Sequence, residues 1–340
     1  MTQAVHEKGG YIYAQLWHCG RATLPHFTGH PTICSSSEPW GSDDHYPIPL
    51  PGTDSTFARF KDFPPQKLEE DGIRRVIEEH QRAALDAMRV GFDGVEVHGA
   101  NGYCESSTWP PLVRVLPDSL SHPVPEQFLS SNINTRDDAY GGSSEKRTKF
   151  VLDLLSALAS TIGSHNVGIR LSPFGLCHQT RSTQRIETWS HLCRDIAKLS
   201  LSYVHFIEPR WEQLHSLEDK AAFLSGAGLG DITLSPFREL LGSTPVISAG
   251  GWNADNCWDV IESGEVDALA FGRLFLANPD FVDRLRQGRA MNAYIRSTFY
   301  GPDRVIGYTD YPTWEEARNR KGHQWVGDVI DDPSPEFEKL

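Results

Sequence analysis

Three polar residues near the end of a predicted strand have the types needed to act on a carbonyl compound. The strand is predicted over 94–100, and His98, Asn101 and Tyr103 lie at or just beyond its end. A histidine and an asparagine can both donate hydrogen bonds to one carbonyl oxygen and polarise it, and a tyrosine hydroxyl can donate a proton. A lone strand histidine is usually a core residue, but the three together indicate a candidate catalytic site.

Glycines and an arginine at the ends of the last two predicted strands are typical of a phosphate site. Gly250 and Gly251 occur in "VISAGGW", and Gly272 and Arg273 occur in "FGRLF". Glycines let backbone N–H groups approach a phosphate closely, and an arginine adds a bidentate charge. Either motif alone could simply be a tight turn that needs glycines, or a turn followed by a surface arginine. Both motifs together, on the last two strands, favour a phosphate-bearing cofactor.

Arg170 lies in the middle of the strand predicted over 167–173. A buried arginine needs an anionic partner. One candidate is the N1/C2 carbonyl edge of a flavin, which becomes negative on reduction. A salt bridge to Glu96 or Glu208 is the alternative.

The elements that must position these residues alternate between strand and helix. Buried strands are predicted over 11–18, 94–100, 167–173, 203–209, 244–250 and 267–273, and helices over 72–90, 145–163, 187–199, 235–241 and 253–263. This alternation indicates a parallel α/β fold. A doubly wound sheet would carry GxGxxG after its first strand, and none is present. Nearly every strand ends in a polar or glycine residue, as on the rim of a (β/α)8 TIM barrel, so a barrel is expected.

The strand count is six, whereas such a barrel has eight strands. The opening residues "MTQAVHEKGG" are typical of the end of a helix that stops at Gly9 and Gly10, just before the first strand. We therefore expect a single domain over 1–340, a barrel that is missing its first two β/α units. The alternative is that two more strands lie within 19–65, although that stretch lacks β-branched runs.

Composition narrows the class of protein. The net charge is −13, from 32 basic and 45 acidic residues, which disfavours a nucleic-acid partner. No apolar run approaches 18 residues and the N-terminus has no signal-peptide core, so neither a membrane span nor secretion is expected. The six cysteines form no CxxC pair, so no metal site is expected and a reducing, cytoplasmic compartment is favoured.

Seven motifs together resemble the old yellow enzyme family. They are "AQLWHCGR", "DGVEVHGANGY", "NTRDDAYGGSSEKRTKF", "GIRLSPFG", "VISAGGW", "ALAFGRLFLANPDFVDRL" and "DYPTWEEA", in matching order over most of 8–317. The resemblance implies a barrel that binds FMN, uses NADPH and reduces the C=C bond of a small-molecule enone or enal, as a monomer or homodimer. It implies ping-pong catalysis, in which NADPH reduces the flavin first.

The resemblance also implies a role for each matching residue. His98 and Asn101 would bind the substrate carbonyl oxygen, and Tyr103 would protonate the α-carbon after hydride reaches the β-carbon. The other implied roles are flavin contacts by Gln15 and Arg170, phosphate contacts by Gly250, Gly251, Gly272 and Arg273, and pocket lining by Trp17 and Tyr300.

Residues 104–124 depart from the family pattern, in which Gly-Tyr is followed closely by Leu and then by Gln-Phe-Leu. One interpretation is a retained intron. Codons TGT-GAG for Cys104-Glu105 contain a splice donor, and CCA-GTG for Pro123-Val124 contains an acceptor. Excision joins T to TG, which encodes leucine and restores the pattern. A real substrate loop is the alternative. With four prolines and no periodic face, the insert is expected to be poorly ordered and to hinder both the pocket and the packing of 125–145.

Two other functions remain open at this stage. The first is a non-catalytic barrel remnant that cannot hold flavin, since the first two strands would carry flavin contacts. The second is a flavin-dependent isomerase on the same scaffold. Flavin colour would distinguish the remnant from a reductase, and the activity of Tyr103→Phe would distinguish an isomerase, which could survive that change.

Overall fold

The computed structural model describes most of the chain. The described residues are 1–46, 49–53, 56–100, 124–176, 179–208, 222, 225–226, 233–295, 298–299, 305–320 and 322. The core of the fold is a six-stranded parallel sheet. Its strands are β1 (Tyr13–Leu16), β4 (Gly94–Gly99), β5 (Val167–Leu171), β6 (Tyr203–Ile207), β7 (Val246–Ala249) and β8 (Ala268–Ala270).

The strand order follows the chain. Neighbouring strands pair in the order β1-β4-β5-β6-β7-β8, and all five pairings among them are parallel. A doubly wound sheet would reverse its order at a switch point, whereas barrel strands follow one another round the sheet. All six strands predicted from the sequence are confirmed, and their order favours the barrel.

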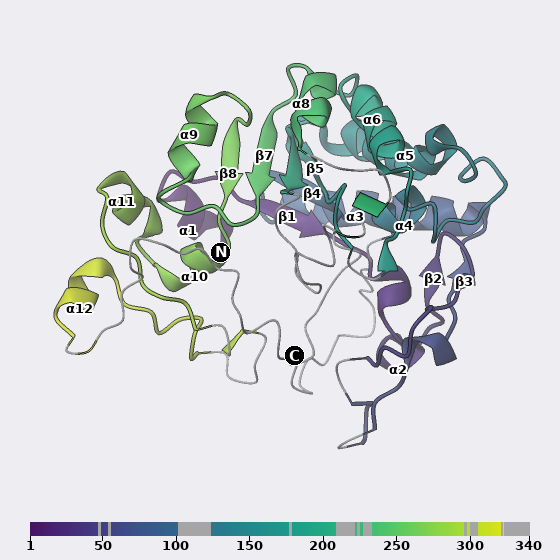
Figure 1. Cartoon of the computed structure of the whole chain (residues 1–340), viewed down its shortest axis with the longest axis horizontal. Helices are drawn as coiled ribbons and strands as arrows, with labels where there is room; N and C mark the ends of the chain where they lie inside the picture. Colours follow the sequence, from purple (N-terminus) through teal and green to yellow (C-terminus); the bar gives the residue numbers. More distant parts are fainter. Residues whose placement is uncertain are drawn as a thin grey trace.

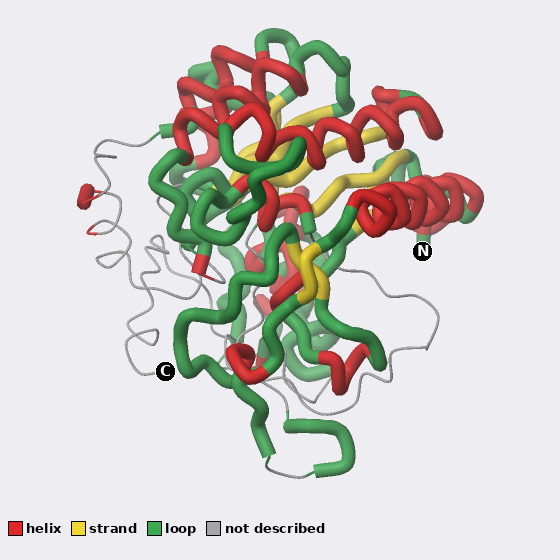
Figure 2. The backbone as a smooth tube through the Cα atoms, turned by 90° about the vertical axis from the view of Figure 1, so that its right-hand side faces the viewer, coloured by secondary structure: helices red, strands yellow, loops and turns green. Residues whose placement is uncertain are grey.

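Helices follow the strands and cover the outer face of the sheet. The longer ones are α3 (Glu70–Arg89), α5 (Ser144–Ile162), α6 (Arg185–Ile196), α8 (Ser235–Leu241) and α9 (Cys257–Glu262), and each confirms a predicted helix. Figure 1 shows α5, α6 and α8 along one side of the sheet. Figure 2 shows the strands and long helices in one half of the molecule and mostly loops in the other.

Short elements complete the described chain. These are α1 (Thr2–His6), α2 (Pro25–Thr28), α4 (Pro125–Leu129), α10 (Arg273–Ala277), α11 (Phe281–Arg286), α12 (Trp314–Arg318) and the 3-10 helices Gly20–Ala22, Phe60–Asp62 and Ser164–Asn166. Helix α1 confirms the predicted helix end, and Gly9 follows it with φ +76°. None of the described helices is both long and apolar enough to cross a bilayer.

The strands have an apolar outer face and a polar inner face, because side chains alternate along a strand. On β4, Val95 and Val97 are fully buried in the main core, together with Leu154 of α5. Glu96 and His98 alternate with these valines and therefore lie on the opposite, inner face. The outer face packs against the helices, and the inner face carries the polar side chains of the candidate site.

Two short strands lie in or beside 19–65, the stretch that could contain two further barrel strands. They are β2 (Ile33–Cys34) and β3 (Gln66–Lys67), which pair with each other in a separate parallel sheet. Among the described residues of that stretch, these strands are therefore not additions to the barrel sheet.

The segment after the insert is well packed. Helix α4 is buried throughout, and its Phe128 stacks on Phe150 of α5 at 4.4 Å between ring centroids. Asn134 donates hydrogen bonds to the carbonyl oxygens of Phe128 and Tyr140, both at 2.8 Å. The expectation that the insert hinders the packing of 125–145 is therefore wrong, because this segment is fixed by its own aromatic and polar contacts. The insert itself, up to residue 123, lies outside the described residues.

Candidate active site

Four predicted site residues lie on strands β1, β4 and β5 or directly after β1. Gln15 on β1 is in register with Glu96 on β4, and His98 on β4 is in register with Arg170 on β5. Trp17 follows β1 and is half-buried. The other members of the predicted catalytic and pocket set, Asn101, Tyr103 and Tyr300, lie outside the described residues. The structure thus brings together Gln15, His98 and Arg170 on three adjacent strands.

Glu96 is the centre of a hydrogen-bonded group on this inner face. Gln15 Nε2 donates to Glu96 Oε1 at 2.5 Å, and His205 Nδ1 on β6 lies 2.9 Å from Glu96 Oε2. Burial alone would raise the pKa of the Glu96 carboxyl group. The hydrogen bonds from His205 and Gln15 and the nearby charge of Arg170 outweigh burial and lower the pKa to about 2. Glu96 is therefore ionised at neutral pH.

His98 is a neutral imidazole in this environment. Burial disfavours its charged form, and the positive charge of Arg170 adds to that effect, so the pKa of His98 falls to about 3. A neutral imidazole carries one N–H donor and one acceptor nitrogen. It can therefore donate a hydrogen bond to a carbonyl oxygen across the whole physiological pH range.

His205 was not predicted as a site residue. Its pKa is also lowered by burial, so it is neutral and donates from Nδ1 to the ionised Glu96. The sequence did contain a signal. Glu96 and His98 are two residues apart in "VEVH", and His205 alternates with apolar residues in "YVHFI", so all three belong to the inner faces of their strands.

The backbone at the ends of β7 and β8 leaves open space. Gly250 and Gly251 have φ values of +127° and +70°, a region that favours glycine. A Cβ placed on Gly251 or Gly272 would meet no heavy atom within 4 Å. Asn256 Nδ2 holds the loop by donating to the Gly251 carbonyl oxygen at 3.1 Å. These glycines form a cradle that a phosphate group could enter.

Arg273 begins α10 beside this cradle and contacts a tyrosine that sequence reasoning missed. Its Nη1 donates to the Tyr294 hydroxyl at 2.7 Å, and the guanidinium carbon lies 5.0 Å from the Tyr294 ring centroid. Tyr294 lies in an irregular segment after α11, where the sequence has no periodic pattern. Only the fold shows that it orients the arginine.

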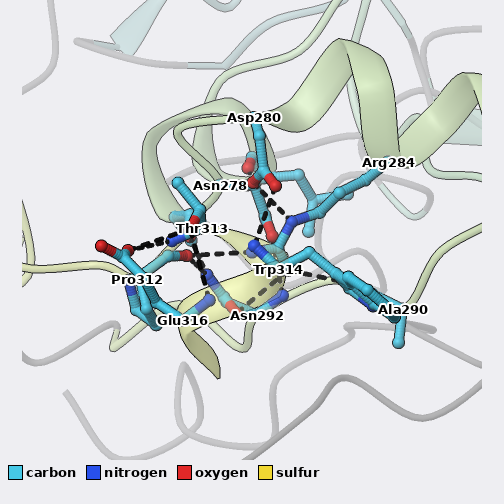
Figure 3. A network of polar contacts seen from close by, with 11 residues as sticks. Asn278, Asp280, Arg284, Ala290, Asn292, Pro312, Thr313, Trp314 and Glu316 are labelled. Atoms are coloured by element: carbon cyan, nitrogen blue, oxygen red, sulfur yellow. Dashed lines mark hydrogen bonds and ion pairs between the residues drawn. The ribbon is translucent and has the colours of Figure 1, made fainter. Parts of the chain in front are cut away.

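The segment that carries Tyr294 is anchored by Arg284 of α11, which is completely buried. The acceptors of its hydrogen bonds, at 2.6–3.0 Å, are the Asp280 side chain, the Ala290 carbonyl, the Asn292 side chain and the Pro312 carbonyl. Figure 3 shows this network joining α11 to the segment before α12. Asn292 itself donates to the carbonyl oxygens of Ala277 and Pro312. The network therefore fixes the chain from Ala277 to Asn292 against Pro312, and Tyr294 follows directly after it.

Comparison with known proteins identifies the family. The sequence profile of the NADH:flavin oxidoreductase / NADH oxidase family matches residues 1–107 and 124–292. The chain belongs to this family. The profile passes over 108–123, which lies within the segment predicted as an insert. The polar inner face and the glycine cradle described above are thus those of a flavin oxidoreductase barrel.

Individual relatives agree with this membership. The chain is 39% identical over 322 residues to the flavin oxidoreductase hxnT of Emericella nidulans, covering 92% of this chain and 75% of that protein. It is 35% identical over 319 residues to 12-oxophytodienoate reductase 1 of Oryza sativa subsp. japonica, covering 93% of this chain and 72% of that protein.

Solved structures show the same architecture. Morphinone reductase superposes with a TM-score of 0.73 at 34% identity, covering 94% of this chain and 77% of that chain. The old yellow enzyme homologue from Zymomonas mobilis gives 0.72 at 26% identity, covering 92% and 76%. The chain is an oxidoreductase of the old yellow enzyme type with an α/β-barrel fold, and the resemblance inferred from its motifs is confirmed.

FMN, the cofactor of this family, fits the residues that are present. The glycine cradle has room for a phosphate, since a Cβ at two of its positions would meet no atom within 4 Å. The inner face offers hydrogen-bonding groups and the charge of Arg170, and the Gln15 side chain on it is exposed. An isoalloxazine ring needs such groups along its pyrimidine edge.

Proposed function

We propose that this protein reduces the C=C bond of an α,β-unsaturated aldehyde or ketone, with FMN as the bound cofactor and NADPH as the electron donor. The observation that carries the proposal is the neutral His98 in register with Arg170 on the inner face. It combines a donor for a carbonyl oxygen with a positive charge suited to a reduced flavin. The names of the relatives, 12-oxophytodienoate reductase and morphinone reductase, agree with it.

The substrate would be bound and protonated by residues near the end of β4 and just after it. His98 and Asn101 donate hydrogen bonds to its carbonyl oxygen, which polarises the conjugated double bond. FMN would supply, once NADPH has reduced it, the hydride that the β-carbon needs. Tyr103 then delivers a proton to the α-carbon. NADPH acts in the first half of a ping-pong cycle, before the enone or enal binds.

Other residues hold the cofactor and shape the pocket in this proposal. Gln15 and Arg170 contact the pyrimidine edge, and Trp17 and Tyr300 line the substrate pocket. The phosphate is held by Gly250, Gly251, Gly272 and Arg273. The partners are small molecules, and the protein acts as a monomer or homodimer. A cytoplasmic site of action suits Cys19, Cys34, Cys193 and Cys257, which are free thiols in the structure.

We also propose that residues 104–124 are a retained intron and are absent from the active form. Ala100 before this region and Pro125 directly after it are both buried, so packed parts of the fold lie on either side of it. The family profile passes over 108–123, which supports the proposal. Transcript sequencing across the region tests it. Transcripts that retain every base, from a gene without GT and AG at the two junctions, would show instead a genuine loop.

The test of the proposed reaction is reconstitution with FMN followed by an assay with NADPH and 2-cyclohexen-1-one. The chain as printed and a form with 104–124 replaced by leucine are compared. We expect yellow protein and enone-dependent NADPH oxidation, greatest in the second form and lowered by Tyr103→Phe. Colourless protein in both forms would indicate a barrel remnant. Double-bond migration that survives Tyr103→Phe would indicate an isomerase.

A further inference from the structure

Gln15, Glu96 and His205 form one hydrogen-bonded group across the inner face of the sheet. The roles proposed above use Gln15 but give none to Glu96 or His205. The bond from His205 to Glu96 crosses β5, which lies between their strands. At that level β5 has Gly168, in register with both Glu96 and Tyr203. A Cβ on Gly168 would lie 2.5 Å from the Tyr203 ring, so a glycine is needed at this position beside the ring.

The charge state of Glu96 fixes the direction of both hydrogen bonds. Its pKa of about 2 makes it a carboxylate, and a carboxylate only accepts. The Gln15 atom that faces it at 2.5 Å must therefore be the amide nitrogen, and the Gln15 carbonyl oxygen is turned away. His205, whose pKa is lowered by burial, must likewise carry its proton on Nδ1.

In Gln15 and His205, the polar side-chain atom that does not face Glu96 is a hydrogen-bond acceptor. The exposed Gln15 side chain offers its Oε1 to the space in front of β1. His205 Nε2 is buried without a hydrogen-bond partner among the described residues. Without Glu96, a glutamine amide could rotate by 180° and offer a donor instead. The Glu96 carboxylate thus holds the Gln15 amide in one orientation, with its nitrogen toward Glu96 and its oxygen available as an acceptor.

We propose that Glu96 is a positioning residue that presents the Gln15 carbonyl oxygen as an acceptor for a ring N–H, so that the site selects a flavin with an unsubstituted imide nitrogen. This proposal rests on FMN binding in the proposed function. The imide N–H of an isoalloxazine is the donor on its pyrimidine edge. A flavin with a methyl group on that nitrogen, 3-methyl-FMN, has no such donor.

The test compares FMN with 3-methyl-FMN on the apoprotein, by quenching of flavin fluorescence. In the wild type, loss of one hydrogen bond at a fixed acceptor should weaken binding of the methylated flavin about tenfold. Gln15→Leu is the matched control, because its ratio of the two dissociation constants measures the steric effect of the methyl group alone. In Glu96→Gln the ratio should fall toward that of Gln15→Leu. An unchanged wild-type ratio in folded Glu96→Gln would overturn the proposal.

A second measurement needs neither flavin nor a folded variant. Nitrogen-15 NMR of the wild-type apoprotein at neutral pH and above should show His205 as a neutral ring protonated on Nδ1. Protonation on Nε2, or a charged ring, would overturn the role of Glu96 even if FMN binds. If His205 has the expected form but neither flavin binds, the FMN proposal fails while the orientation of His205 by Glu96 stands.

Discussion

His98 on β4 is in register with Arg170 on β5, and the two side chains determine each other's chemistry. Burial and the arginine charge lower the pKa of His98 to about 3, so the guanidinium is the positive charge of the pair and the imidazole is a neutral donor. This division suits a site that must hold both an electron-rich cofactor edge and a substrate carbonyl.

Replacing Arg170 with methionine should raise the pKa of His98, because a positive charge that disfavours imidazolium is removed. Burial remains, so the pKa should stay below 6.5. NMR titration of the His98 ring in the apoprotein measures the change. A pKa that stays at about 3 would show that Arg170 does not act on His98.

His98 should make the protein less stable in mild acid. A histidine in the unfolded chain titrates near 6.5, whereas folded His98 titrates at about 3. Between these values the unfolded chain binds more protons, so the free energy of unfolding should fall as the pH falls from about 6.5 toward 3. Urea unfolding between pH 5 and 7 should show a shallower pH dependence for His98→Gln than for the wild type. If the free energy of unfolding depended on pH equally in both proteins, groups other than His98 would cause the loss of stability in acid.

Gly272→Ala should weaken FMN binding and leave the stability of the folded apoprotein nearly unchanged. Gly272 has φ −102°, which alanine tolerates, and the added Cβ would meet no atom within 4 Å. The melting temperature of the apoprotein should change little, while FMN should bind at least about tenfold more weakly if the methyl group enters the space of the phosphate. Gly41→Ala is the control, since its Cβ would make an ordinary 3.5 Å contact with Gln179. Equal FMN affinity in both variants would mean that the cradle does not hold the phosphate.

Arg284→Met should strongly destabilise the protein. The arginine is completely buried, and its loss would remove one hydrogen-bond donor from Asp280 and from each of three other acceptors. Breaking a buried ion pair typically costs about 3–5 kcal/mol. Arg286→Met, on the same helix, removes only an exposed pair with Asp283 and should cost less than about 1 kcal/mol. Chemical denaturation of the two variants gives the comparison, and similar losses would contradict the anchoring role of Arg284.

Local patterns predicted much of the architecture. Continuous apolar runs such as 94–100 and 203–209 identified strands, because a parallel strand covered by helices is apolar over its length. The helix at Ser144–Ile162 followed from its three- and four-residue spacing. The packing of 125–145 was mispredicted, because its aromatic and polar contacts depend on distant partners such as Phe150.

The candidate site was less predictable where it depends on distant pairs. Gln15, His98 and Arg170 could be chosen because each stands on a predicted strand. Glu96 and His205 are 109 positions apart, and their hydrogen bond follows only once β4, β5 and β6 are placed side by side. Tyr294 could not be predicted for a related reason, since its partner Arg273 reaches it across the tertiary fold.

The central claim is that the barrel passes a hydride to an enone. The most direct test is anaerobic stopped-flow absorbance on FMN-loaded protein that has first been reduced with NADPH and is then mixed with 2-cyclohexen-1-one. We expect the oxidised flavin spectrum to return while cyclohexanone forms, and to return at least about a hundredfold more slowly in His98→Ala. Reduced flavin that persists in the presence of enone but is reoxidised by oxygen would contradict the account.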